Sequence, residues 1–178
     1  MDHPSPRPRP PRLTLVLGGA RSGKSRHAEG LVTATPPPWI YVATAQAYDD
    51  EMTARIAQHR SCRVEGWTTI EAPLDLADAI SAQAGSGQTM LIDCLTLWLS
   101  NVMLDGRDVE AACDRLIGAL TAAASPLVIV SNEVGLGIVP DNALARRFRD
   151  AQGRLNQQVA ARADRVVLMA AGLPLTLK

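Results

Sequence analysis

The segment that most constrains this chain is a glycine-rich stretch near its start, Gly18-Gly-Ala-Arg-Ser-Gly-Lys-Ser25. It follows the short apolar run Leu13–Leu17 and leads into residues 24–33, which predict a helix that ends before three consecutive prolines. A Gly-x-x-x-x-Gly-Lys-Ser turn between a buried strand and a helix is the Walker A pattern of a P-loop. An ordinary glycine-rich turn is the alternative, and the strand before it and the helix after it argue against that alternative.

The residue types of this loop suit a triphosphate. Its glycines let backbone amides turn toward the phosphates, and the N-terminus of the following helix adds positive partial charge. Lys24 is expected to reach the β- and γ-phosphates, and the Ser25 hydroxyl to bind magnesium. The loop therefore predicts that a nucleoside triphosphate binds near the start of the fold.

Short apolar runs alternate with stretches of helical character over the rest of the chain. Continuous apolar strands that alternate with helices predict a mainly parallel sheet with helices on both faces. The expected fold class is therefore α/β, a P-loop NTPase of the RecA-like kind. Strands are predicted at residues 13–17, 39–44, 68–71, 90–93, 127–131, 165–169 and 173–177, and helices at 24–33, 49–60, 73–84, onward to 124 with an interruption near Gly106, and 142–162.

The length of 178 residues is typical of one domain. We assign residues 13–178 to it and interpret residues 1–12, rich in proline and arginine, as a disordered tail. Because 18 basic and 18 acidic side chains cancel, no nucleic-acid or anionic-membrane partner is predicted. The sequence has neither a signal-peptide pattern nor the apolar run of ~18 residues that a membrane span needs. Cys62, Cys94 and Cys113 are far apart, so we expect small buried residues in a reducing, cytoplasmic compartment.

Two acidic residues follow predicted strands at the edge where α/β sheets bind ligands. Asp93 ends the apolar run 90–92, the position of a Walker B carboxylate that helps to hold magnesium. Apolar strands that end in aspartate are common, so the pattern alone leaves this role open. Glu133 follows the run 127–131 and is either a base for a substrate hydroxyl or an ordinary loop residue.

His59 lies on the predicted helix 49–60, where it shares a face with Met52 and Ile56. A lone histidine on such a face is most often a packed residue, and the functional alternative is a nucleophile or an acid–base group. Spacing favours the packed residue. Two groups of arginines could either bind phosphate or form a solvated basic surface, and the second role is the more common. They are Arg55, Arg60 and Arg63 near His59, and Arg146, Arg147 and Arg149 on the predicted helix 142–162.

Six linked motifs together resemble one family, the bifunctional adenosylcobinamide kinase / adenosylcobinamide-phosphate guanylyltransferases of cobalamin biosynthesis. They occur in the family's order from about Leu13 onward, and as a set they are far more specific than a P-loop alone. The motifs are Gly18-Gly-Ala-Arg-Ser-Gly-Lys-Ser-Arg-His-Ala-Glu29, Tyr41-Val-Ala-Thr-Ala45, Asp50-Glu-Met-x-x-Arg-Ile-x-x-His59-Arg60, Trp67-Thr-Thr-Ile-Glu71, Asn132-Glu-Val-Gly-x-Gly-Ile-Val-Pro140 and Arg147-Phe-Arg-Asp-x-x-Gly-Arg-x-Asn156.

The resemblance implies two reactions in one site. The aminopropanol hydroxyl of adenosylcobinamide is phosphorylated from ATP or GTP, and GMP is then transferred from GTP onto that phosphate. It also implies a covalent GMP–histidine intermediate on His59, which reverses the interpretation that spacing favours. Gln58 precedes His59, so this chain has one histidine at the motif, where some relatives have two.

The same resemblance implies the site residues and the assembly. His59 and Lys24 would be catalytic, Ser25 and Asp93 would hold Mg²⁺, and the family's homotrimer places each site near a subunit border. The nucleotide would contact Gly18, Gly19, Ala20, Arg21, Ser22, Gly23, Lys24, Ser25, Ala43, Thr44, Ala45, Arg60, Ser61, Cys62, Arg63, Glu71 and Asp93.

Two other functions fit parts of the sequence. A P-loop kinase of another small metabolite would keep Lys24, Ser25 and Asp93 but would have no use for a nucleophile at His59. A GTP-binding switch needs a DxxG and an NKxD motif. The sequence has no NKxD, and its only DxxG, at residues 150–153, lies inside a predicted helix, so the switch is a poor match.

Overall fold

The computed structural model describes residues 11–46 and 64–178, which contain seven strands and five helices. The strands are β1 (Leu13–Gly18), β2 (Trp39–Ala43), β3 (Trp67–Glu71), β4 (Met90–Asp93), β5 (Leu127–Asn132), β6 (Arg165–Ala170) and β7 (Leu173–Thr176). The helices are α1 (Lys24–Thr33), α3 (Leu76–Gln83), α4 (Leu95–Leu104), α5 (Val109–Ala122) and α6 (Ala143–Arg162).

The strands form one sheet in the order β3-β2-β4-β5-β1-β6-β7. Neighbouring strands are parallel except β6 and β7, which form an antiparallel hairpin. β1 therefore lies inside the sheet, where Gly18 is level with Asn132 of β5 and Met169 of β6. Because β1 to β6 run in the same direction, their carboxyl ends meet at one edge, and ligands of α/β sheets bind at that edge.

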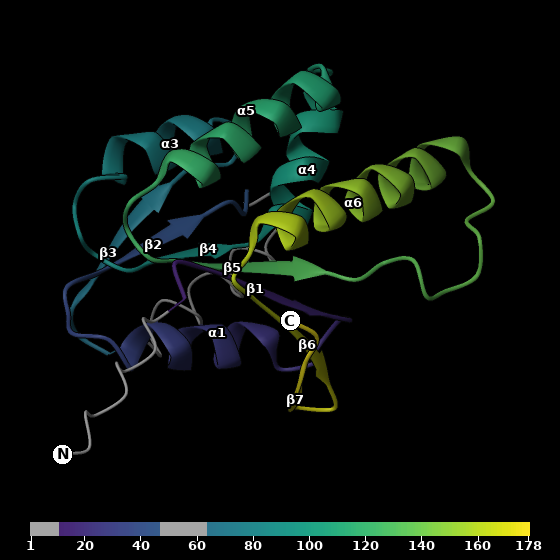
Figure 1. Ribbon diagram of the computed structural model, residues 1–178. Helices are drawn as coiled ribbons and strands as arrows, with labels where there is room; N and C mark the ends of the chain where they lie inside the picture. Colours follow the sequence, from purple (N-terminus) through teal and green to yellow (C-terminus); the bar gives the residue numbers. More distant parts are fainter. Residues whose placement is uncertain (1–10, 47–63) are drawn as a thin grey trace, which may run out of the picture.

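Helices cover both faces of the sheet. Among the described helices, α1 lies on one face and α3, α4, α5 and α6 lie on the other (Figure 1). Side chains of β1 alternate between two hydrophobic cores: Leu13, Leu15 and Leu17 pack on the side of the four helices, and Val16 packs with Val32 of α1. Burial on both faces explains the continuous apolar sequence of the strands and confirms the predicted α/β class.

The predicted and observed elements differ at the start of α3. A helix from Pro73 was expected because proline suits a first helical turn, but α3 begins at Leu76. The carbonyl of Pro73 instead accepts a hydrogen bond from the Asn101 amide of α4, and the Leu74 carbonyl accepts one from the Trp98 indole. Two side chains of α4 thus hold this segment outside the helix.

Arg12 lies at the boundary that the sequence interpretation drew between tail and domain. Its guanidinium donates hydrogen bonds to the carbonyls of Leu120 and Ala123 at the end of α5, at 2.8 and 3.0 Å. Its own carbonyl accepts from the amide of Leu127 at 2.7 Å. Arg12 is therefore part of the folded domain rather than of the tail, because it binds carbonyls that the last turn of a helix leaves unpaired.

Two predictions fall where the structure gives no description. Residues 1–10, most of the predicted tail, and residues 49–60, the predicted helix that carries His59, lie outside the described residues. None of the helices that the structure does describe combines the length and the apolar character needed to cross a bilayer.

Candidate active site

The phosphate loop joins the carboxyl end of β1 to the first turn of α1. A side chain at Gly18 would place its Cβ 2.9 Å from the Met169 carbonyl oxygen and against the Ser22 hydroxyl, so only glycine fits between β1 and β6. Gly23 has φ +91°, a backbone conformation that glycine adopts without strain, and it precedes the first helical residue, Lys24. Two of the pattern's glycines are therefore required by the observed backbone.

Lys24 lies over the loop that it follows. Its ammonium donates a hydrogen bond to the Gly19 carbonyl at 3.0 Å. Its charge also acts on Cys94, the residue after the β4 carboxylate Asp93. The lysine of the Walker A pattern and the end of β4 therefore lie within electrostatic reach of each other, although β5 lies between β4 and β1 in the sheet.

The turn between β6 and β7 holds the phosphate loop from the other side. The amide of Gly172 donates to the Ser22 carbonyl at 3.0 Å, and the Cα of Gly172 lies 3.4 Å from the place of a Cβ on Gly23. Ser22 itself is buried. The loop is thus packed against a hairpin from the far end of the sequence, an arrangement that restricts its backbone before any phosphate binds.

Three residues predicted to contact the nucleotide form a row across neighbouring strands. Ala43 at the end of β2 is level with Glu71 of β3 and with Asp93 of β4. The hydroxyl of Tyr41 donates to Oδ2 of Asp93 at 3.0 Å, and the Tyr41 ring packs edge-on against Trp67 with 5.9 Å between centroids. The aromatic pair therefore orients the Asp93 carboxylate at the edge of the sheet.

Thr44 joins the ends of β2 and β4. Its buried hydroxyl donates to the Cys94 carbonyl at 2.7 Å and accepts from the Cys94 amide at 2.8 Å. Its carbonyl accepts from the Asn101 amide at 2.8 Å, and the same amide binds Pro73. Asn101 thereby positions the segment that holds Asp93, a role that the sequence pattern did not indicate.

The two described cysteines are buried, as the sequence predicted. Burial raises the pKa of the Cys94 thiol to about 11, and the neighbouring Asp93 charge contributes in the same direction. Burial likewise raises the pKa of Cys113 to about 11. Both thiols are protonated at neutral pH, which argues against a nucleophilic role for either one.

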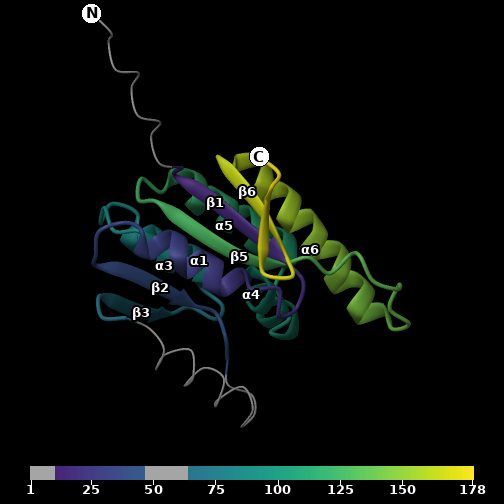
Figure 2. The ribbon, with the colours of Figure 1, turned by 90° about the horizontal axis from the view of Figure 1, so that it is seen from below.

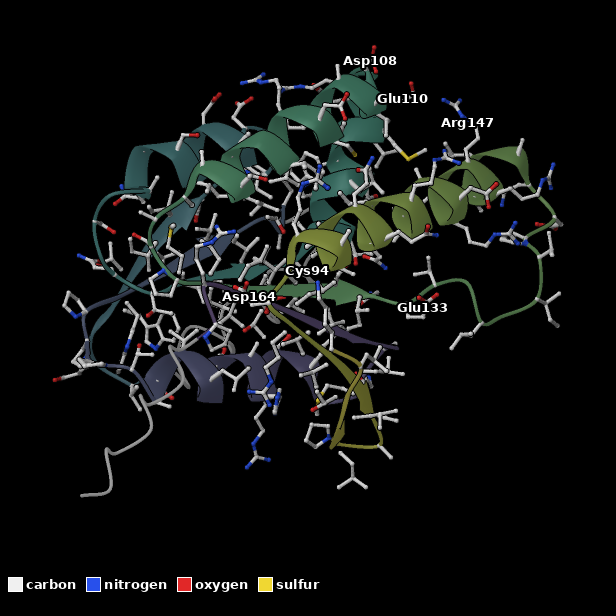
Figure 3. The ribbon with its side chains drawn as sticks, in the orientation of Figure 1. Cys94, Asp108, Glu110, Glu133, Arg147 and Asp164 are labelled. Carbon is white, nitrogen blue, oxygen red and sulfur yellow. The ribbon has the colours of Figure 1, made fainter. Side chains whose placement is uncertain are left out.

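Glu133 lies directly beyond β5, next to the phosphate loop (Figure 3). Its amide donates to the Gly18 carbonyl at 3.1 Å, which continues the pairing of β5 with β1. Its carboxylate accepts from the Gly135 amide at 2.6 Å. Glu133 is half-buried. The structure therefore places a carboxylate at the ligand-binding edge, where both the loop role and the role of a base remain compatible with its contacts.

A buried amide cluster behind Glu133 connects β5 to α6. Asn156 accepts from the Ser131 hydroxyl at 2.7 Å and donates to the Asn132 carbonyl at 3.0 Å. Gln152 donates to both Ser131 and Asn156, at 2.9 and 3.0 Å. In the sequence, Asn132 begins one of the six motifs and Asn156 ends another, but neither motif indicates that the two residues meet. A glutamine and an asparagine four residues apart on a helix do not reveal a strand partner either.

The arginines of α6 divide between a loop contact and the surface. Arg146 donates to the carbonyls of Pro140 and Asp141 and so holds the loop before the helix. Arg149 pairs with Asp150, and Arg147 is exposed at the outer end of α6 (Figure 3). Spacing favoured a solvated basic surface for all three arginines. Arg146 differs from that expectation, because it binds carbonyls near the N-terminus of α6.

Several predicted site residues cannot be placed. His59, Arg60, Ser61, Cys62 and Arg63 lie outside the described residues, and their roles stay predictions. Within the described residues, no group of three His, Cys, Asp or Glu side chains gathers as a metal site. The Ser25 hydroxyl and the Asp93 carboxylate are hard oxygen donors of the kind that suits Mg²⁺, which usually also takes phosphate oxygens and water as ligands.

The fold and the loop define the chain as an α/β P-loop NTPase. Solved structures support this class: the flagellar accessory protein FlaH from Methanocaldococcus jannaschii aligns with a TM-score of 0.56 over 94% of this chain and 78% of its own, at 14% identity. The RadB recombinase aligns with a TM-score of 0.52 over 88% of this chain and 73% of its own, also at 14% identity. At these identities the likeness shows the fold alone.

Sequence comparison identifies the family. Residues 14–177 match the family model described as Cobinamide kinase / cobinamide phosphate guanyltransferase. The bifunctional adenosylcobalamin biosynthesis protein CobP of Pseudomonas aeruginosa is 46% identical over 166 residues, which cover 92% of this chain and 96% of the relative. The corresponding protein CobU of Escherichia coli K12 is 41% identical over 93% of this chain and 99% of the relative. The chain therefore belongs to the cobinamide kinase / cobinamide phosphate guanyltransferase family of enzymes.

Proposed function

We propose that this enzyme phosphorylates the aminopropanol hydroxyl of adenosylcobinamide and then transfers GMP from GTP onto the new phosphate, giving adenosylcobinamide-GDP. The observation that carries the proposal is the family match over residues 14–177, together with a P-loop whose backbone requires its glycines. Both reactions use a triphosphate, and we expect Lys24 to serve both.

In the kinase step the substrate hydroxyl oxygen attacks the γ-phosphorus of ATP or GTP. The bond to the β–γ bridging oxygen breaks, the nucleoside diphosphate leaves, and the hydroxyl proton passes to a base. Lys24 and the loop amides hold the β- and γ-phosphates through this transfer. Glu133 is our candidate for the base, because its carboxylate lies at the ligand-binding edge and its amide is bonded to Gly18. Mg²⁺ held by Ser25 and Asp93 would neutralise charge on the phosphate oxygens.

In the guanylyltransferase step a neutral His59 imidazole attacks the α-phosphorus of GTP and pyrophosphate leaves. The phosphate oxygen of adenosylcobinamide phosphate then attacks the same phosphorus, and the P–N bond to His59 breaks. A phosphoramidate is reactive enough for this second transfer, which makes a histidine a suitable carrier of GMP. Ala43, Glu71 and Asp93 form the row proposed to face this nucleotide.

The proposal extends to the surroundings of the enzyme. We expect a homotrimer in the cytoplasm, with adenosylcobinamide, ATP or GTP, and Mg²⁺ as its small-molecule partners and without nucleic acid. A P-loop kinase of another small metabolite is the second candidate, and it would use the same cradle without a covalent intermediate.

One labelling experiment separates the two candidates. The protein is incubated with GTP labelled at the α-phosphate, and the denatured chain is examined for an adduct that is labile in acid and stable in base. We expect the adduct on the wild type and on His3→Ala, a matched histidine variant, and its loss from His59→Ala. An unlabelled wild type, or an undiminished adduct on His59→Ala, contradicts the histidine intermediate.

The substrate is tested separately. Adenosylcobinamide is supplied with ATP, and then with GTP, and the products are separated by chromatography. We expect adenosylcobinamide phosphate first and the GDP derivative second. If only adenosylcobinamide phosphate forms, the protein is a kinase without guanylyltransferase activity. If neither product forms, the enzyme acts on another substrate.

A further inference from the structure

Asn132, the last residue of β5, has a side chain that the proposed reactions do not use. Its Oδ1 atom is buried, and no group of the described residues donates a hydrogen bond to it. A buried acceptor without a donor is costly, so such atoms are rare in folded proteins and commonly have a function. A molecule bound at the carboxyl edge of the sheet would supply the missing donor.

The backbone of Asn132 is held by neighbours on both of its polar groups. Its amide donates to the Thr96 hydroxyl at the start of α4 at 2.8 Å, and its carbonyl accepts from the Asn156 amide of α6 at 3.0 Å. Asn132 is also level with Gly18 at the end of β1. The point from which the side chain projects is therefore fixed before a substrate binds.

Strand alternation places this side chain on the face of the sheet that α1 covers. Val128 and Val130 of β5 pack in the core that includes α1, whereas Ser131 bonds to α6 on the opposite face. Asn132, one residue further, returns to the α1 face. On this face α1 packs against β1, β4 and β5 (Figure 2). Since α1 begins directly after the phosphate loop, the Asn132 side chain and the first turn of α1 lie at the same edge.

Two charged groups of the predicted phosphate site lie on the same face. Asp93 follows Leu91 by two residues in β4, and Leu91 packs in the α1 core. Lys24 is the first residue of α1, and its charge acts on Cys94, next to Asp93. In the sheet order β4-β5-β1, Asn132 lies between the strand of Asp93 and the strand of the P-loop. The three side chains therefore belong to one part of the carboxyl edge.

This part of the edge suits the γ-phosphate rather than the α-phosphate. The Walker A lysine binds the β- and γ-phosphates, and the metal that the β4 carboxylate helps to hold bridges oxygens of the same two groups. The Lys24 ammonium donates to the Gly19 carbonyl, next to the residue that is level with Asn132. A triphosphate held by Lys24 and Asp93 would therefore present its γ-phosphate beside Asn132.

We propose that the Asn132 amide is a catalytic group of the kinase step: its N–H donates to a γ-phosphate oxygen, and its Oδ1 accepts from the attacking hydroxyl. The inference rests on the proposed kinase function. A side-chain amide has one acceptor oxygen and two N–H donors, so one residue can hold both reacting groups. The hydroxyl proton still passes to the base as the new P–O bond forms, since the amide only orients the hydroxyl.

The guanylyltransferase step should depend on Asn132 much less. In that step the α-phosphorus is attacked and pyrophosphate leaves, so the γ-phosphate is carried away unchanged. A contact that is equally strong in the bound state and in the transition state changes binding but not the rate of the bound complex. Loss of the amide is therefore expected to separate the two activities.

The contact with the γ-phosphate is tested by calorimetry without a corrinoid. Dissociation constants are measured, with Mg²⁺ present, for ADP and for an ATP analogue that has an imido group between the β- and γ-phosphates. We expect Asn132→Ala to weaken binding of the analogue about tenfold or more and binding of ADP less than about twofold. An equal loss for both nucleotides, or no loss for the analogue, would overturn the inference.

Rates at saturating nucleotide test the selectivity for the kinase step. We expect Asn132→Ala to lower the kcat of adenosylcobinamide phosphorylation about 100-fold, the usual size for one lost hydrogen bond to a transition state. Formation of the GMP adduct from saturating GTP should change less than about threefold. A parallel fall of both rates, or undiminished phosphorylation, contradicts the role of Asn132.

Ser125→Ala is the matched control. Ser125 lies two residues before β5, at the opposite edge of the sheet, where its buried hydroxyl accepts from the Gly87 amide at 3.1 Å. The substitution thus removes a buried polar group far from the cradle, and urea unfolding compares the stability of the two variants. We expect wild-type nucleotide affinity and kcat from Ser125→Ala. Losses equal to those of Asn132→Ala would trace both to stability and overturn the inference.

Because the calorimetry needs no corrinoid, this inference and the proposed function fail separately. If the wild type does not phosphorylate adenosylcobinamide, the proposed substrate is wrong, and a selective loss of the ATP analogue in Asn132→Ala still supports the γ-phosphate contact. If the wild type phosphorylates adenosylcobinamide and Asn132→Ala binds the analogue with wild-type affinity, only the role of Asn132 is wrong.

Discussion

Gly18 illustrates how one residue links the sheet to the phosphate loop. It is the last residue of β1, its carbonyl accepts from the Glu133 amide, and its Cα faces the Met169 carbonyl of β6. Gly19, the next residue, has no heavy atom within 4 Å of the place of a Cβ. Close packing therefore requires a glycine at position 18 but not at position 19. The glycine-rich sequence alone does not distinguish the two positions.

We expect Gly18→Ala to lower the free energy of unfolding by about 1–3 kcal/mol, because the new methyl group overpacks the junction of β1 and β6. ATP affinity should fall with it, since the loop that begins at Gly18 has to move. Urea unfolding and calorimetry measure the two effects. Gly19→Ala is the matched control, with a change in stability of less than about 0.5 kcal/mol. Equal destabilisation by both substitutions would contradict this account.

At the scale of elements, the C-terminus of α5 is bound by the side chain of Arg12, the residue just before β1. Arg12 binds the Leu120 and Ala123 carbonyls, where the C-terminus of a helix favours a cation, and it is half-buried. Arg115 of the same helix pairs with Asp78 of α3 at 2.9 Å, but both side chains are largely exposed. Geometry and burial, rather than the number of polar contacts, distinguish these two arginines.

Arg12→Ala is expected to destabilise the protein by about 1–2 kcal/mol, because two buried carbonyls lose their partner. Arg115→Ala should cost less than about 1 kcal/mol, the usual size for an exposed ion pair. Chemical denaturation of the two variants under the same conditions measures the difference. A larger loss of stability from Arg115→Ala than from Arg12→Ala would contradict this account of the two arginines.

Most elements were predictable from sequence, whereas their lateral contacts were not. The strand before and the helix after the P-loop follow from local periodicity, and parallel strands necessarily bring Gly18 and Asp93 to one edge. The Asn101 amide that holds Thr44 and Pro73 has no local signature, since its partners lie 57 and 28 residues away. The predicted start of α3 at Pro73 was wrong for the same reason, because side chains of α4 bind this segment. Local patterns cannot report such distant partners.

At the scale of the whole molecule, exposed apolar residues gather on the segment between β5 and α6. Leu136 is 88% exposed and Ile138 is 97% exposed. This segment extends away from the sheet (Figure 1). Contiguous apolar surface of this kind marks contact sites on proteins, and the proposed homotrimer would give it a partner.

We expect the wild type to elute with the mass of a trimer in size-exclusion chromatography with light scattering. Ile138→Asp should shift it toward the monomer, because a buried unpaired charge at an interface is strongly unfavourable. Leu104→Asp, at an apolar residue that is 64% exposed at the end of α4, serves as the control and should leave the mass unchanged. A monomeric wild type would contradict the trimer, and an unaffected Ile138→Asp would exclude this segment from the interface.

The hydrogen bond between Gly172 and Ser22 has a consequence for synthesis on the ribosome. The two residues are about 150 positions apart, and β1 itself is flanked by β5 and β6, which are both made late. At translation rates of about 5–20 residues per second, the nascent chain carries its phosphate loop for roughly 8–30 s before the hairpin that supports it exists. During that interval the loop lacks its Gly172 hydrogen bond, and we expect a nucleotide to stabilise the fold through this loop only once β6 and β7 have been made.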